Sequence, residues 1–386
     1  MFFLAATPFE LNQSGFVYLI KAIALGGIIV YATLIRDARA STFSPLIAIA
    51  FLLFLVTNLT AWSDRVAIAL PLILFGAVLG QVRGTKWDRD FYSVVFLFIA
   101  VHVAALIFAT LLYYTTSTVL DIHGLVFPEA SRAMAIGDIG RLSGFHTEPG
   151  TYSQWTLAAL LLLALIRGVL STQWHAVVIG SVLMTLSLWG VLASGLFALA
   201  FLVEAVLVRD LSSKSRRLLI VASFALIGIG LSYLISPEIR QAAIDFLSLK
   251  ASFSTQSGLD KLRAAHFLSE NYTKALLLGL PIDPGFCPTC ISPQDSGLAL
   301  TGSFYLGFAF SGFLAAVIAV RLGTLWNWGF VFAILPLFVW KAHVYEPLLW
   351  IIVGYILAGP SRACTDPTRY AGRARRPRSR IAGHAQ

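Results

Sequence analysis

The sequence predicts an all-α integral membrane protein with about eleven transmembrane helices. The first observation is composition, since 58% of the 386 residues are hydrophobic and only 12% are charged, whereas soluble domains carry about 25% charged residues. The second is a series of apolar runs that approach or exceed the ~18 residues of a membrane-spanning helix. Because lipid offers no partners to backbone N–H and C=O groups, such runs must be helical.

The excess of positive charge is concentrated at one end of the chain. The formal net charge is +9, and residues 361–386 hold seven arginines against one acid, Asp366. A short basic tail beside a final span is typical of a topology signal and a contact for anionic lipids. We therefore expect a disordered cytoplasmic tail at 361–386, following one polytopic domain at 1–360, and we expect no nucleic-acid partner.

The apolar runs place the spans to within about two to four residues. The expected spans are Phe16–Ile35, Phe43–Thr57, Val66–Val82, Phe91–Tyr114, Thr151–Ile166, Trp174–Trp189, Val191–Val208, Leu218–Ile235, Leu298–Val320, Trp328–Trp340 and Pro347–Ala358.

Lys and Arg residues orient these spans. One set of short loops is densely basic, including 83–89 and 209–217, and the arginine tail falls on the same side. By the positive-inside rule that side is cytoplasmic, which leaves the N-terminus outside. Two long hydrophilic segments, at about 115–150 and 236–297, then face outward, and any water-facing site belongs to them.

The end of the first outer segment, 140–150, is the most informative stretch. Pro149 suits the first position of a helix, and Glu148 before it is expected to be extended. A helix N-terminus favours an anion, and Arg141 adds a guanidinium that can grip a phosphate. Glu148 is a candidate general base for an incoming hydroxyl. The alternative is an Arg141–Glu148 salt bridge that only pins the loop.

The second outer segment carries another basic pair. Arg263 and His266 are three residues apart, so a helix would place them on one face, and the stretch 279–281 is expected to end that helix. A second basic group toward an outer cavity is what a diphosphate-bearing substrate requires. The alternative is an amphipathic helix lying on lipid headgroups.

Other polar residues lie near these segments. We regard Arg132, His146, Asp295 and His343 as candidate substrate-binding residues, and Lys341 and Glu346 sit in the same outer turn as His343. Lys21 is expected to snorkel to the outer interface.

Cys287 and Cys290 form a C-x-x-C in the second outer segment. Zinc binding needs two further ligands, and no matching second pair exists in the sequence. In an oxidising space outside a bacterial inner membrane, a loop disulfide is favoured over free thiols.

The chain resembles the oligosaccharide repeat-unit polymerases of bacterial surface polysaccharides, the Wzy type. The resemblance rests on an Arg-x-x-Gly-hydrophobic-x-x-Glu-Pro pattern before a span, here 141–149. Small residues in the following span pair agree with it, as do Arg263 upstream of Leu278–Pro281 and Asp295–Gly297 before a Gly-rich span. The small residues are Ser187, Gly190, Ser194 and Gly195.

The resemblance implies a GT-C-like glycosyltransferase that works on the outer face of the inner membrane. Its donor would be a polyprenyl-diphosphate-linked oligosaccharide, with Arg141 and Arg263 stabilising the departing diphosphate and Glu148 or His266 acting as base. Two arginines would neutralise the leaving group, so no metal or other cofactor is expected. A chain-length regulator and a flippase are possible partners. The alternatives are an O-antigen ligase, which shares the architecture, and a transporter or flippase of lipid-linked oligosaccharide.

Overall fold

The computed structural model describes most of the apolar helices and part of each outer segment. The described residues are 2, 15–35, 39–40, 45–59, 64–126, 134–136, 139–168, 170, 173–207, 241, 245, 248, 256–280, 297–326, 328–339 and 346–359. The expected span Leu218–Ile235 and the tail 361–386 lie outside them.

The described part is predominantly helical. Its helices are α2 (Gly15–Leu34), α3 (Pro45–Asn58), α4 (Asp64–Gln81), α5 (Thr85–Thr116), α6 (Ile122–Val126), α7 (Pro149–Arg167), α8 (Gln173–Met184), α9 (Leu188–Leu207), α12 (Gln256–Glu270), α13 (Tyr272–Ala275), α14 (Gly297–Leu306), α15 (Phe308–Arg321), the π-helix η2 (Leu322–Trp326), α16 (Trp328–Val339) and α17 (Pro347–Ala358). Two short antiparallel ladders pair β1 (Arg39–Ala40) with β2 (Val82–Arg83), and β3 (Met134–Ile136) with β4 (Ile139–Arg141).

Among the described residues, three stretches of helix are long and apolar enough to cross a membrane, judged by length and composition. They are Thr85–Thr116, Pro149–Arg167 and Phe308–Trp326, and shorter apolar helices accompany them. At 32 residues, α5 is about 48 Å long, and it exposes large apolar side chains such as Leu97, Phe108 and Leu111. These features are consistent with a membrane-embedded protein.

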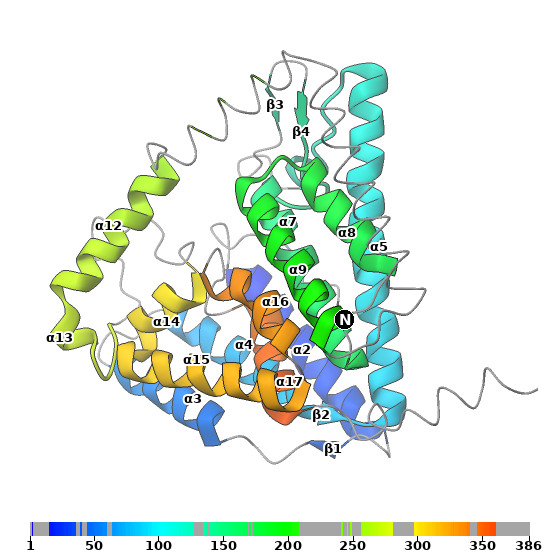
Figure 1. Ribbon diagram of the computed structural model, residues 1–386. Coiled ribbons are helices and arrows are strands. Elements are labelled where there is room, and N and C mark those ends of the chain that lie inside the picture. Colours follow the sequence, from blue (N-terminus) through cyan, green and yellow to red (C-terminus); the bar gives the residue numbers. More distant parts are fainter. Residues whose placement is uncertain are drawn as a thin grey trace, which may run out of the picture.

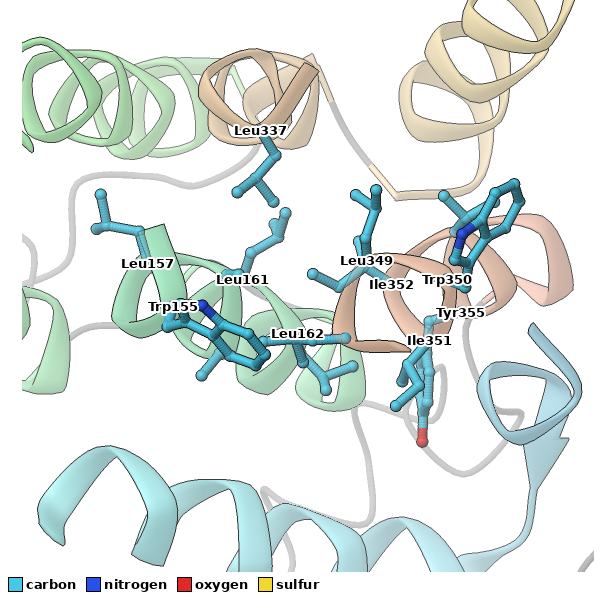
Figure 2. Close-up of a cluster of buried hydrophobic side chains, with 14 of the residues drawn as sticks. Trp155, Leu157, Leu161, Leu162, Leu337, Leu349, Trp350, Ile351, Ile352 and Tyr355 are labelled. Atoms are coloured by element: carbon cyan, nitrogen blue, oxygen red, sulfur yellow. The ribbon is translucent and has the colours of Figure 1, made fainter. Parts of the chain in front are cut away.

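Helix α7 lies at the centre of this arrangement. Every residue of its apolar window is buried, and it packs against α5, α8, α9 and α17. Figure 2 shows Trp155, Leu161 and Leu162 of α7 among side chains from α16 and α17, including Leu337 and Leu349. Because α7 has no lipid-facing side, its position is determined by the helices around it. Its first turns therefore have a fixed place in the fold.

Small residues bring α4 and α17 into close contact. A Cβ built on Gly354 would lie 2.7 Å from the Ala77 carbonyl oxygen and 2.8 Å from Gly80 Cα. Such close crossings of small residues are common between helices in membranes. At the C-terminal ends of the pair, the Arg83 guanidinium donates to the Gly80 carbonyl at 2.8 Å and the Tyr355 carbonyl at 2.9 Å, which caps both helices.

The expected single span Leu298–Val320 is wrong, because the chain breaks there into α14 and α15. Gly307 between them has φ +83°, and a helix cannot continue through that backbone conformation. The segment 276–280 runs against the break, where the Ala309 N–H donates to the Leu276 carbonyl at 3.0 Å and the Leu280 N–H donates to the Phe304 carbonyl. With ten residues, α14 is only about 15 Å long and cannot cross the bilayer alone.

Gly279 is expected to be intolerant of a side chain. It has φ +74°, and an added Cβ would lie 2.5 Å from the Phe304 carbonyl oxygen. Gly279→Ala should therefore lower the melting temperature, since the left-handed conformation alone costs about 1–2 kcal/mol. Gly312→Ala is the matched control, because its Cβ would meet nothing within 4 Å. A Gly279→Ala protein that melts like wild type would contradict the observed packing.

Most of the other described spans agree with the expected ranges, but α5 begins six residues before Phe91, α8 ends five residues before Trp189 and α9 begins three residues before Val191. Pro347–Ala358 has the expected bounds, and α2, α3, α4, α7 and α16 begin and end within two residues of theirs.

Another difference from the sequence prediction concerns the basic helix of the second outer segment. It was expected to run to Gly279, but α12 ends at Glu270 and a separate short helix, α13, follows after Asn271.

Candidate functional site

The candidate site lies at the start of α7. Glu148 is the N-cap residue, with φ −148° and ψ 157°, and Pro149 occupies the first turn. Both features were expected from the sequence, because Pro favours an extended residue before it and lacks the N–H that a first helical turn leaves unpaired. Glu148 is half-buried, so its carboxylate sits at the edge of the protein interior.

Arg141 is held in position by the β3–β4 ladder. It ends β4 and pairs with Met134 of β3, and it precedes Glu148 by seven positions in the sequence. The ladder thereby restrains the backbone of Arg141, a few residues before α7 begins at Pro149. Both members of the predicted Arg–Glu motif thus belong to a short segment with a defined conformation.

The connecting residues 142–148 fold tightly against α5. Gly144 has φ +59°, and a Cβ there would lie 3.3 Å from the Leu106 backbone nitrogen, which explains glycine at this place in the motif. The Ser143 hydroxyl donates to the His146 carbonyl at 2.7 Å, and a His123 ring nitrogen lies 3.2 Å from the Phe145 carbonyl. These contacts make residues 142–148 a packed turn.

His146 is fully buried within this turn, at 0% exposure. Its ring lies 5.0 Å from that of His102 and 5.4 Å from that of Tyr152. Neither ring nitrogen has a hydrogen-bond partner among the described residues. Burial, reinforced by the neighbouring His102 and His123, lowers the pKa of His146 well below its ordinary value, so the imidazole is neutral. The substrate-binding role expected for His146 stays a prediction, and in this structure its ring does not reach the surface.

Protonation of His146 is expected to weaken the fold. The unfolded chain binds this proton near pH 6.5, whereas the folded protein does not, so stability falls as the pH is lowered below about 6.5. Melting temperatures measured between about pH 7.5 and pH 5.5 should therefore drop less in His146→Leu than in wild type. His266→Leu, which removes an exposed histidine of α12, serves as the control and should keep the wild-type slope. An equal drop in His146→Leu and wild type would contradict the assignment.

The first turns of α7 carry a polar face toward α8 and α9. The Tyr152 hydroxyl donates to Ser181 Oγ at 2.8 Å, and Ser153 Oγ lies 3.3 Å from Thr185 Oγ1. Gly190 of α9 approaches so closely that a Cβ would lie 2.6 Å from Ser153 Oγ. Gly190, one of the small residues noted in the sequence, therefore allows α9 to pack directly beside the start of α7.

Lys21 was expected to extend to the outer membrane interface, but its side chain is buried. Its side chain is 1% exposed, and Nζ lies 3.7 Å from Glu346 Oε2 and 5.4 Å from the centre of the Trp155 ring. Glu346 is the N-cap of α17. A buried amine is costly unless it is paired, and the partner here is 325 residues away in the sequence. Lys21 and Glu346 therefore join α2 and α17 beside the second turn of α7.

Arg263 and His266 lie on α12, as expected, and both are exposed. Nδ1 of His266 is 3.3 Å from Glu270 Oε1. The buried side of α12 packs through Phe267, whose ring lies 6.2 Å from that of Phe304 in α14. In Figure 1, α12 stands apart from α7 and β4. The structure thus places Arg141, His146 and Glu148 on one short segment of the chain, and α12, which carries Arg263 and His266, stands apart from it.

Several predicted residues fall outside the described part of the chain. They are Arg132, Asp295, His343, Lys341, Cys287 and Cys290. Within the described ranges, no group of three or more His, Cys, Asp or Glu side chains is arranged to hold a metal ion.

Comparisons with protein-family models, with curated proteins and with solved structures found no match for this chain. The functional assignment therefore rests on the residues of the site and on the sequence motif.

Proposed function

We propose that the chain is a membrane glycosyltransferase that polymerises polyprenyl-diphosphate-linked oligosaccharide repeat units. It acts on the outer face of the bacterial inner membrane, with the N-terminus outside, the C-terminus cytoplasmic and a GT-C-like arrangement of about eleven spans. The observation that carries the proposal is the segment 139–149, in which a ladder-held Arg141 leads through a packed turn to Glu148 at the N-terminus of α7.

This arrangement suits transfer of a glycan from a diphosphate. The α7 N-terminus favours negative charge, and Arg141 would stabilise the diphosphate as it leaves. Glu148 would accept the proton of the attacking sugar hydroxyl. The bond between the anomeric carbon and the diphosphate oxygen breaks, a glycosidic bond forms to the attacking hydroxyl oxygen, and the polyprenyl diphosphate departs. A chain-length regulator and a flippase are proposed as protein partners.

The role of Arg263 as a second diphosphate contact requires α12 to approach the start of α7. Arg263 stands on a helix that is connected to α14 through α13 and the segment 276–280. The two arginines therefore have different proposed roles. Arg141 belongs to the site as it stands, whereas Arg263 contributes only when α12 has closed over the substrate.

Two other functions have an observation in their favour. The exposed His266, paired with Glu270, favours an O-antigen ligase with a histidine base. The helix broken at Gly307 favours a transporter of lipid-linked oligosaccharide, because transporters place binding sites at discontinuous helices.

The test uses Arg141→Ala and Arg263→Ala in a bacterial host lacking its own polymerase, at matched membrane levels. The proposal expects the polymer ladder to vanish in Arg141→Ala while lipid-linked single repeats accumulate outside. Full-length ladders in Arg141→Ala would refute the site. Single repeats trapped on the cytoplasmic face would instead assign transport.

A further inference from the structure

A small polar cavity lies beside the second turn of α7, apart from Glu148. Its volume is about 20 Å³, and it is lined by Gln154, Trp155 and Ala158 of α7, Leu337 of α16, and Glu346, Leu348 and Leu349 at the start of α17. A cavity holds a water-sized group when about 10–15 Å³ is available to it. This cavity therefore has room for one hydroxyl.

The polar groups around the cavity are not satisfied by the protein. Gln154 is 7% exposed and lines the cavity, and no hydrogen bond to its amide is seen among the described residues. Glu346 Oε2 likewise accepts no hydrogen bond within the described ranges. It lies 3.7 Å from Lys21 Nζ, which is longer than a hydrogen bond. Buried polar groups normally have partners, so these groups point to a ligand.

The balance of charge selects the kind of ligand. Lys21 and Glu346 carry opposite charges, so a bound cation would be repelled by one and a bound anion by the other. A hydroxyl fits both kinds of group, because it can donate to the Glu346 carboxylate and accept from the Gln154 amide. Trp155 forms an apolar wall beside them.

We propose that Gln154 and Glu346, with Lys21 and Trp155, form a subsite that binds one hydroxyl group of a neutral sugar. Gln154 is six residues beyond Glu148, which is about 9 Å along the helix. The name of the ligand rests on the proposed function, whereas the preference for a neutral hydroxyl follows from the site itself.

The test measures binding rather than transfer. Full-length protein is purified in a detergent without a sugar headgroup, and its melting temperature is followed while neutral methyl glycosides are added. Glucuronate and glucosamine serve as charged analogues of similar size. The proposal expects a saturable rise with at least one neutral glycoside and binding at least about tenfold weaker for both charged analogues.

Gln154→Leu should abolish the rise while melting at or above the wild-type temperature without ligand, because it removes an unpartnered buried amide. Gln81→Leu is the matched control, since Gln81 is also buried in a span and should leave the response unchanged. No rise in wild type, or an equal rise in Gln154→Leu, overturns the subsite. If the wild-type protein binds a neutral glycoside but forms no polymer, the subsite stands and the polymerase proposal is rejected.

Discussion

Glu148→Gln is expected to lower the rate of repeat-unit transfer by about 10²–10⁴-fold, the usual contribution of a general base. The substitution keeps the size of the side chain at the N-cap of α7 and removes both the negative charge and the ability to take a proton. Initial rates in membranes, normalised to the amount of folded protein, measure the effect. The melting temperature should change much less than the rate.

The control for Glu148→Gln is Asp90→Asn, which removes a carboxylate near the first turn of α5 and should leave the rate unchanged. If Glu148 serves only to pin the 142–148 turn through a salt bridge, Glu148→Gln will instead lower the yield and melting temperature at an unchanged specific rate. A wild-type rate in Glu148→Gln together with a large loss in His266→Asn would move the base to α12.

Lys21→Met is expected to give the largest loss of stability. It leaves the Glu346 carboxylate, at 8% exposure, without its countercharge, and breaking a buried pair in this way costs about 3–5 kcal/mol. The yield of monodisperse protein and its melting temperature should both fall sharply. Lys274→Met is the control, because Lys274 of α13 is exposed.

The double variant Lys21→Met/Glu346→Gln separates pairing from packing. It removes both charges at similar volume, so most of the lost stability should return, since replacing a buried pair as a whole is often nearly neutral. A single variant as stable as wild type would mean that the pair is not buried in the folded protein. A double variant no better than Lys21→Met would mean that the amine and carboxylate act independently.

The sequence predicted the features that depend on neighbouring residues. The start of α7 followed from Glu148 and Pro149 because their backbone preferences are local. The bounds of α2 and α17 followed from the lengths of their apolar runs. The break at Gly307 could not be predicted in this way, because a glycine inside an apolar run is also compatible with a continuous helix, and its φ depends on contact with residues 276–280.

Features that depend on distant partners were missed. Lys21 in isolation is best placed at an interface, and only its contact with Glu346 makes burial favourable. The cavity beside Gln154 had no sequence signal, since it is formed where α7 meets α16 and α17, which lie far from α7 in the chain. The grouping of Arg263 with Arg141 was inferred from the chemistry of a diphosphate, and α12 stands apart from β4 in the described structure.

Reconstitution of the purified full-length protein with its lipid-linked substrate tests directly whether the protein polymerises repeat units with Glu148 as the base. The wild-type protein and Glu148→Gln would be placed in proteoliposomes with one purified polyprenyl-diphosphate-linked repeat unit and no nucleotide sugar. We expect the wild-type protein to produce a ladder of lengthened lipid-linked glycan and to release a matching amount of polyprenyl diphosphate. We expect neither product from Glu148→Gln. Movement of unextended repeats across the bilayer, with no ladder and no release, would contradict it.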